Sequence, residues 1–318
     1  QILQANWRQH SCGSGLCEPV HDPCEISCRA CQHADGACLL IAAALHNPWV
    51  AALVALFLWW FSTGAILLVV RRADQAGRQA RIWAVLMNLP FLILGAVGFL
   101  ESRYDESLAG VYVAFLSAIA LWGWIELAFL TGVITGPNRN RLRDGVPEWE
   151  RFIRAWGTIA YHELLLVFMM VTMILFSLDA VNPFGMWTFA ILFFARISAK
   201  LNLYLGVRKI NVEFIPEPLN HLPSHFRTAR MNWLFPLSIT GLSFAAACWM
   251  ERIWSAQTMS QEIGFALLAA LTMLALLEHW FMVLPLPDER LWRWMLPSRQ
   301  SNGQDGPQIA ILQNEDVR

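Results

Sequence analysis

Residues 108–135 read LAGVYVAFLSAIALWGWIELAFLTGVIT and contain a single charged side chain, that of Glu126. About 20 consecutive apolar residues are enough for an α-helix to cross the hydrocarbon core of a bilayer. We therefore predict that this stretch is a transmembrane helix, and we ask whether the rest of the chain follows the same pattern.

The composition of the whole chain is that of an integral membrane protein. Of its 318 residues, 56 % are hydrophobic and only 15 % are charged, and the mean hydropathy is +0.43. Soluble domains carry about a quarter charged residues. The charges also lie in short segments between long charge-free runs, so the net charge of −1 gives no information about partners. The apolar composition predicts contact with membrane lipid. The basic residues form no continuous stripe, so we expect no nucleic-acid partner.

Seven stretches are long and apolar enough to cross a membrane. Backbone groups in lipid must be hydrogen-bonded internally, so stretches of this length predict helices. The alternation of a membrane β-barrel is absent. We predict an all-α, polytopic membrane protein whose spans cover residues 49–70, 82–100, 108–135, 153–177, 184–206, 233–250 and 263–284.

Every second connection is rich in arginine or lysine, as in segments 71–81, 137–154 and 207–230, and the segment after the last span is basic as well. The intervening connections are short, and acidic or nearly neutral. Because positive residues remain on the cytoplasmic side, this alternation predicts an outside N-terminus and a cytoplasmic C-terminus. Segment 207–230 contains three prolines, which argue against one continuous helix, and we expect an ordered loop there.

The sequence predicts three regions, namely residues 1–46, a transmembrane domain at 47–295, and a disordered cytoplasmic tail at 296–318. The first region holds six of the seven cysteines. An outside N-terminus favours disulfides there, with undetermined connectivity. The alternative is that this region is not part of the mature protein, because the chain lacks an initial Met and its first Met is Met87.

Ionisable side chains inside spans are costly and usually face the bundle interior in pairs. At about 1.5 Å of rise per residue, the predicted spans place seven of them in one layer, roughly 9 to 15 Å from the cytoplasmic boundary. Asn202 is a further hydrogen-bonding candidate in the same layer. The layer consists of Glu126 in the third span, His162 and Glu163 in the fourth, Arg196, Lys200 and Asn202 in the fifth, and Glu278 and His279 in the seventh.

Several roles fit such a layer. The first is a charge-compensated network that only fixes helix packing. The second is a metal or tetrapyrrole site with His162 or His279 as axial ligand. The third is a proton relay or an acid–base pair, and the fourth is a transport pathway. Neighbouring residues on a helix point about 100° apart, so His162 and Glu163 cannot both face one metal.

Five linked motifs resemble one family. They are LFLWWFSTGAIL (56–67), LWGWIELAFLTGVITGP (121–137), ARISAKLNLYLGV (195–207), MNWLFPLSIT (231–240) and LEHWFMVLPLPDERLWRW (277–294). Together these are similar to the photosynthetic complex assembly proteins of the PuhE type, which are encoded with reaction-centre genes in purple and related phototrophic bacteria. The resemblance covers roughly residues 50 to 295.

The resemblance implies an inner-membrane factor that supports assembly of the reaction centre and its core antenna by modulating bacteriochlorophyll supply. Bacteriochlorophyll or a precursor is then the candidate ligand. Reaction-centre or antenna subunits, or pigment-synthesis enzymes, are the candidate partners. No catalytic residues carry over, and we favour a role other than catalysis. The alternative is a membrane enzyme that acts on a pigment precursor or isoprenoid with Glu126, His162, Glu163 and His279 at its centre.

Overall fold

The computed structural model describes residues 44–143, 145–210 and 215–284. The chain divides into two compact units, residues 1–44 and 45–318, and the second contains the fold described below. The predictions for the cysteine-rich region 1–46, except its last three residues, and for the tail 296–318 lie outside the described residues.

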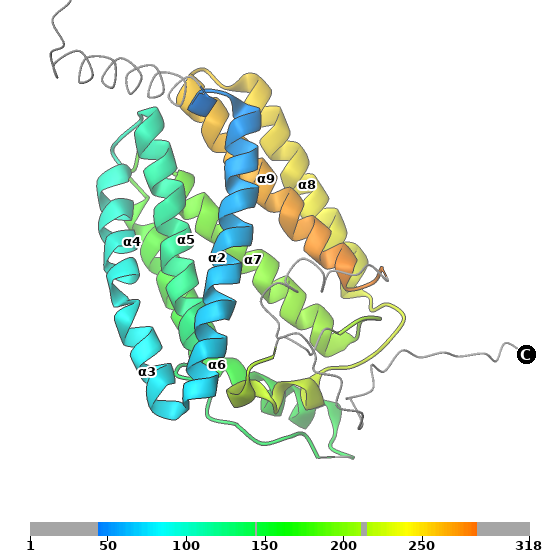
Figure 1. Cartoon of the computed structure of the whole chain (residues 1–318). Coiled ribbons are helices and arrows are strands. Elements are labelled where there is room, and N and C mark those ends of the chain that lie inside the picture. Colours follow the sequence, from blue (N-terminus) through cyan, green and yellow to red (C-terminus); the bar gives the residue numbers. More distant parts are fainter. Residues whose placement is uncertain (1–43, 144, 211–214, 285–318) are drawn as a thin grey trace, which may run out of the picture. The chain divides into compact units, whose positions relative to one another are not determined.

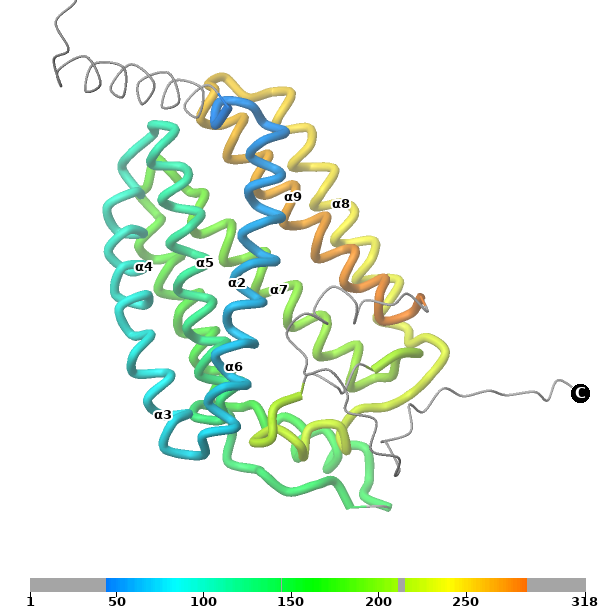
Figure 2. The backbone as a smooth tube through the Cα atoms, viewed as in Figure 1, coloured from blue at the N-terminus to red at the C-terminus, as the bar shows by residue number. Residues whose placement is uncertain are grey.

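The described part of the chain is helical and contains no strand; its one isolated bridge joins Val207 to Thr228. Figures 1 and 2 show long helices bundled side by side. In chain order the elements are α2 (Pro48–Ala76), α3 (Arg78–Met87), α4 (Leu89–Ser102), α5 (Leu108–Leu130), α6 (Glu148–Phe176), α7 (Phe184–Leu205), the short 3₁₀ helices η1 (Glu217–Leu219) and η2 (Leu222–His225), α8 (Leu234–Ser255) and α9 (Met259–Phe281).

Seven helical segments are long and apolar enough to cross a membrane, which confirms the predicted all-α polytopic class. The second span is made of α3 and α4, which meet at Asn88. Pro90 follows at the start of α4, where its missing N–H breaks the hydrogen-bond ladder. The Asn88 side chain donates instead to the carbonyl of Ala84.

The predicted end of the third span was wrong by five residues. Helix α5 ends at Leu130, and Gly132 adopts φ +74°, a left-handed conformation that glycine tolerates and that terminates helices. The Thr131 hydroxyl caps this end by donating to the carbonyl of Leu127 at 2.8 Å. The apolar residues after Gly132 therefore belong to a non-helical segment, although their composition alone suggests a longer helix.

Helices α5 and α9 form the centre of the bundle, and both have more buried positions than the other spans. Small residues permit the close approach that stabilises helix pairs in lipid. Ala51 and Ala55 of α2 are buried in one core cluster with residues of α9. Helix α8 packs mainly against α9, along which it runs in Figure 2. Few of the residues of α8 are buried.

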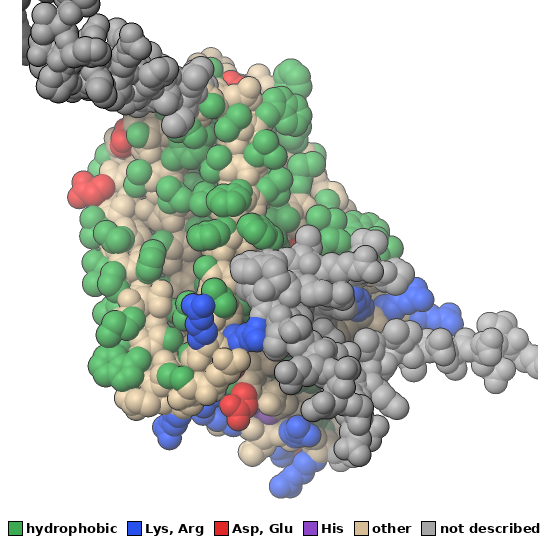
Figure 3. Space-filling model, in the orientation of Figure 1, with side chains coloured by type: hydrophobic (Ala, Val, Ile, Leu, Met, Phe, Trp, Pro, Cys, Tyr) green, Lys and Arg blue, Asp and Glu red, His purple; other side chains and the backbone are tan. Residues whose placement is uncertain are grey.

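Arginine and lysine gather at one end of the bundle, which we call the basic end. It carries the α2–α3 turn at Gly77, the connection 131–147 and the connection 206–233. In Figure 3 blue side chains lie in the lower half of the molecule, whereas the upper half shows green side chains and no blue. The described part of connection 206–233 contains η1 and η2 and not one continuous helix, as its prolines predicted.

Candidate functional site

Five of the predicted polar residues form one ion-pair cluster between α5, α6 and α7. The Arg196 guanidinium donates to the Glu126 carboxylate at 2.9 Å, and the Lys200 ammonium donates to the Glu163 carboxylate at 2.5 Å. The His162 Nε2 atom lies 3.8 Å from Glu126 and 4.0 Å from Glu163. The cluster therefore pairs two cations with two carboxylates around one imidazole.

The backbone of His162 is hydrogen-bonded to the non-helical segment that follows α5. After Gly132 the chain runs along α6, where Thr135 O accepts from His162 N at 3.0 Å and Gly157 O accepts from Asn138 N at 3.0 Å. Gly136 is in direct contact with Gly157, and a Cβ atom at Gly136 would overlap its carbonyl oxygen. Non-helical backbone at membrane depth is tolerated only where protein buries it, and Thr135 is 3 % exposed.

An aromatic ring completes the cluster. Phe129 of α5 stacks on His162 with ring centroids 4.3 Å apart, and Lys200 Nζ lies 5.2 Å from the centre of the same ring. His162 is fully buried, and both of its ring nitrogens lack a hydrogen-bond partner among the described residues. The sequence analysis did not identify Phe129. Its position three residues after Glu126, which places both on one face of α5, was the available indication.

His279 and Asn202 belong to a second, separate hydrogen-bonded group between α7, α8 and α9. His279 Nδ1 lies 2.8 Å from the carbonyl oxygen of Ala275, and His279 Nε2 lies 2.9 Å from the hydroxyl of Ser198. A carbonyl only accepts, so Nδ1 carries the proton. His279 Nε2 and the Ser238 hydroxyl both lie within hydrogen-bond distance of the Ser198 hydroxyl, which has one proton to donate. Asn202 donates to the hydroxyl of Ser238 at 3.0 Å.

Ser198 and Ser238 are thus members of a polar group that sequence reasoning missed. Their hydroxyls are 2.8 Å apart and join α7 to α8. The only available signal was the position of Ser198 four residues before Asn202, which places both on one helix face. Helix α8 has no ionisable residue at this depth, so the charge pattern gave no reason to include Ser238.

A cavity of about 640 Å³ lies beside the ion-pair cluster. Helices α2, α5, α6, α7 and α9 form its walls, and residues of the connection 206–233 contribute to its lining near the basic end. Most of the lining is apolar. Its volume falls within the range of roughly 300 to 1,000 Å³ that is typical of small-molecule sites.

The cavity separates the predicted polar residues into two classes. Glu126, Arg196, Lys200 and Glu278 line it. The described lining includes neither His162 nor His279, and the Nε2 atom of His279 is already engaged by Ser198. A tetrapyrrole in this cavity with either histidine as axial ligand does not fit this arrangement. The described residues also contain no group of three or more His, Cys, Asp or Glu side chains suited to a metal ion.

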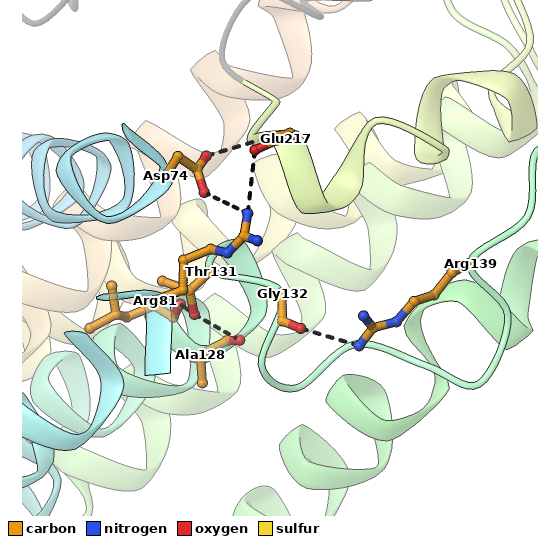
Figure 4. Close-up of polar contacts among 8 residues, drawn as sticks. Asp74, Arg81, Ala128, Thr131, Gly132, Arg139 and Glu217 are labelled. Atoms are coloured by element: carbon orange, nitrogen blue, oxygen red, sulfur yellow. Dashed lines mark hydrogen bonds and ion pairs between the residues drawn. The ribbon is translucent and has the colours of Figure 1, made fainter. Parts of the chain in front are cut away.

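Connection 206–233 is fastened to the helices by charged residues outside the cavity. Arg81 lies 3.3 Å from Asp74 and 3.6 Å from Glu217, and the backbone N–H of Glu217 donates to Asp74 at 3.2 Å. Figure 4 shows Arg81 between these two carboxylates. We call these three residues the latch. In the same view Arg139 reaches back to the carbonyl of Gly132.

A buried arginine fastens the other part of this connection. Arg151 of α6 is 7 % exposed and donates to the carbonyls of Tyr204 and His225, at 3.0 Å each. Its guanidinium also lies 4.3 Å from the centre of the Tyr204 ring. Through Asp74, Arg81 and Arg151, the connection that lines the cavity is therefore bonded to α2, α3 and α6.

Comparison with known proteins identifies a family and a curated relative. Residues 45–303 match the family model described as "Protein of unknown function (DUF3623)". The chain is 57 % identical over 254 residues to a protein of Rhodobacter capsulatus named "Uncharacterized 30.4 kDa protein in puhA 5'region", covering 80 % of this chain and 93 % of the relative. No solved structure matches. Because the family model covers most of the chain, including every described span, the chain belongs to the DUF3623 family.

Proposed function

We propose that the chain is an integral inner-membrane assembly factor for the photosynthetic reaction centre and its core antenna, which acts on bacteriochlorophyll supply or delivery. The observation that carries this proposal is the relative that is 57 % identical and whose name places its gene in the 5' region of puhA. The five sequence motifs support the same assignment, since they resemble a family encoded with reaction-centre genes.

The cavity supplies a physical basis for such a role. An apolar pigment, a precursor or another lipid-like molecule has little solubility in water and needs an apolar environment during transfer. The apolar lining offers that environment, while Arg196 and Glu278 in the same lining offer polar contacts. A pigment held here would be bound without axial ligation by His162 or His279, because neither contributes to the described lining.

The enzymatic alternative rests on the buried Glu126–His162 contact of 3.8 Å. A general base must reach the proton that it removes, directly or through one water. Glu126 lines the cavity but is held by Arg196, and His162 does not line it. This geometry favours a binding role for the cavity, with the ion-pair cluster as a structural part of its wall.

The test is a deletion of the gene in the phototrophic bacterium that encodes it. We expect membranes of the deletion strain to show lower near-infrared absorption of the reaction centre and core antenna, and complementation with the wild-type gene to restore it. Gly123→Leu, which adds a side chain at the cavity wall, should fail to restore absorption, whereas Gly241→Leu on α8, where nothing lies within 4 Å, should restore it. Unchanged absorption in the deletion strain would refute the proposal.

A further inference from the structure

Among the described residues, Glu278 is the one carboxylate of the predicted polar layer without an ion-pair partner. Glu126 is paired with Arg196 and Glu163 with Lys200, whereas Glu278 makes no ion pair or hydrogen bond with the described residues. The Glu278 side chain is exposed, and part of its exposed surface faces the cavity that it lines. A carboxyl group in apolar surroundings is costly unless a partner satisfies it.

Arg196 shares the cavity wall with Glu278 and is incompletely satisfied. Its Nη2 atom donates to Glu126, but its buried Nε has no hydrogen-bond partner among the described residues. The Arg196 side chain is 39 % exposed, although it lies in a spanning helix and lines the cavity. The cavity thus offers an acceptor and a donor that the described residues leave open.

The remainder of the lining suits an apolar chain. Ile191 precedes Arg196 on α7 by five residues, which places it about 7.5 Å farther from the basic end. Trp59, Ile66, Trp122, Ile191 and Leu271 come from four helices and line the same cavity. A ligand with its polar head at Arg196 and Glu278 would place its apolar part among such side chains.

We propose that this cavity binds a neutral amphiphile, namely an apolar chain that ends in a hydroxyl group lying between Glu278 and Arg196. A hydroxyl is both donor and acceptor, so it can donate to Glu278 and accept from Arg196. A charged head between Glu278 and Arg196 would be attracted by one of these side chains and repelled by the other, whereas a neutral hydroxyl can hydrogen-bond to both. This inference rests on the proposed function for its biological use, but binding itself is measured on the purified chain.

Three C18 probes with the same chain and different heads test it, namely oleyl alcohol, oleic acid and oleylamine. The full-length chain is purified in detergent, and native mass spectrometry measures how much of each probe remains bound. We expect oleyl alcohol to saturate at one molecule per chain and to be retained at least tenfold better than the acid or the amine. Equal retention of all three heads would overturn the proposal, because it would indicate apolar partitioning alone.

Matched variants locate the bound probe. Gly123→Leu should lower oleyl alcohol retention at least tenfold, and Gly241→Leu should leave it unchanged, because Gly123 lines the cavity and nothing lies within 4 Å of Gly241. Equal retention in both variants would place the probe on the outer surface and refute the site.

A second pair of variants keeps the test independent of folding at Gly123. Glu278→Gln removes the negative charge but keeps a polar group, so the preference for the alcohol over the acid should fall at least fivefold. Glu251→Gln makes the same change at an exposed residue of α8 and should leave the preference intact. A preference that is unaltered by Glu278→Gln would contradict the assigned head position. If the purified chain did not prefer oleyl alcohol while the gene still complemented the deletion strain, this inference alone would be refuted. If the chain bound oleyl alcohol as expected while the deletion strain showed unchanged absorption, only the assembly function would be refuted.

Discussion

The guanidinium of Arg196 lies 2.9 Å from the carboxylate of Glu126, which is 70 positions earlier in the chain. This pair joins α5 to α7 at the wall of the cavity. Its Glu126 side chain is only 9 % exposed, and the second carboxylate oxygen has no hydrogen-bond partner among the described residues. The ion pair is therefore both a structural link and part of the binding surface.

Glu126→Gln should destabilise the protein because it leaves the Arg196 charge without its partner. Removing one partner of a fully buried pair costs about 3 to 5 kcal/mol, but Arg196 is partly exposed to the cavity, so we expect about 1 to 3 kcal/mol. Thermal unfolding in detergent measures this loss. If Glu126→Gln instead abolished a product in the cell while the melting temperature stayed unchanged, the enzymatic alternative would be preferred.

Helix number and the paired charges were predictable because both depend on local or one-dimensional information. The length of the charge-free runs defines seven spans, and depth alone brings Glu126 and Arg196 to the same level. Depth does not give direction around the helix axis. Glu278 and His279 are adjacent, yet one lines the cavity and the other bonds to Ser198. The cavity itself was not predictable, because its lining includes residues from five helices and a distant connection.

Arg81→Gln should loosen the latch without unfolding the bundle. Glu217 is 73 % exposed, so its ion pair with Arg81 contributes less than about 1 kcal/mol to global stability. The local effect is larger because Glu217 lies in η1, beside cavity-lining residues such as Leu219. We expect faster amide hydrogen exchange at residues 215–222 with little change in melting temperature.

Arg78→Gln is the control, because Arg78 is exposed and makes no ion pair in the described part of the chain. Equal exchange in both variants would show that the latch does not hold this segment.

Acidification should open the same connection. Burial lowers the pKa of His221 and of His225 below the usual value near 6.5, and nearby cations act in the same direction, Arg139 on His221 and Arg151 and Arg154 on His225. Between the folded and unfolded pKa values the unfolded segment binds more protons. The contribution of each neutral histidine is therefore complete above about pH 6.5 and is lost as pH falls below it, by up to about 1.4 kcal/mol per pH unit.

Hydrogen exchange of residues 219–228 at pH values between 5 and 7.5, corrected for the intrinsic pH dependence of exchange, measures this opening. His225→Gln removes one titrating group and should flatten the profile. A His225→Gln profile as steep as that of the wild type would exclude His225 as a cause.

Gly136→Ala should be among the most damaging small substitutions in the chain. The added Cβ would overlap the Gly157 carbonyl oxygen, and this contact cannot relax easily because the same oxygen accepts from Asn138 N. Overpacking of this kind costs about 1 to 3 kcal/mol. Gly241→Ala provides the matched control, since its Cβ meets nothing within 4 Å and alanine is about 1 kcal/mol better than glycine inside a helix. We expect a lower melting temperature for Gly136→Ala and an unchanged or higher one for Gly241→Ala.

Because segment 131–138 bonds to the backbone N–H of His162, Gly136→Ala should also disturb the ion-pair cluster. Combining it with Glu126→Gln should therefore cost less than the sum of the two single changes. Strict additivity would show that segment 131–138 and the ion-pair cluster are energetically independent.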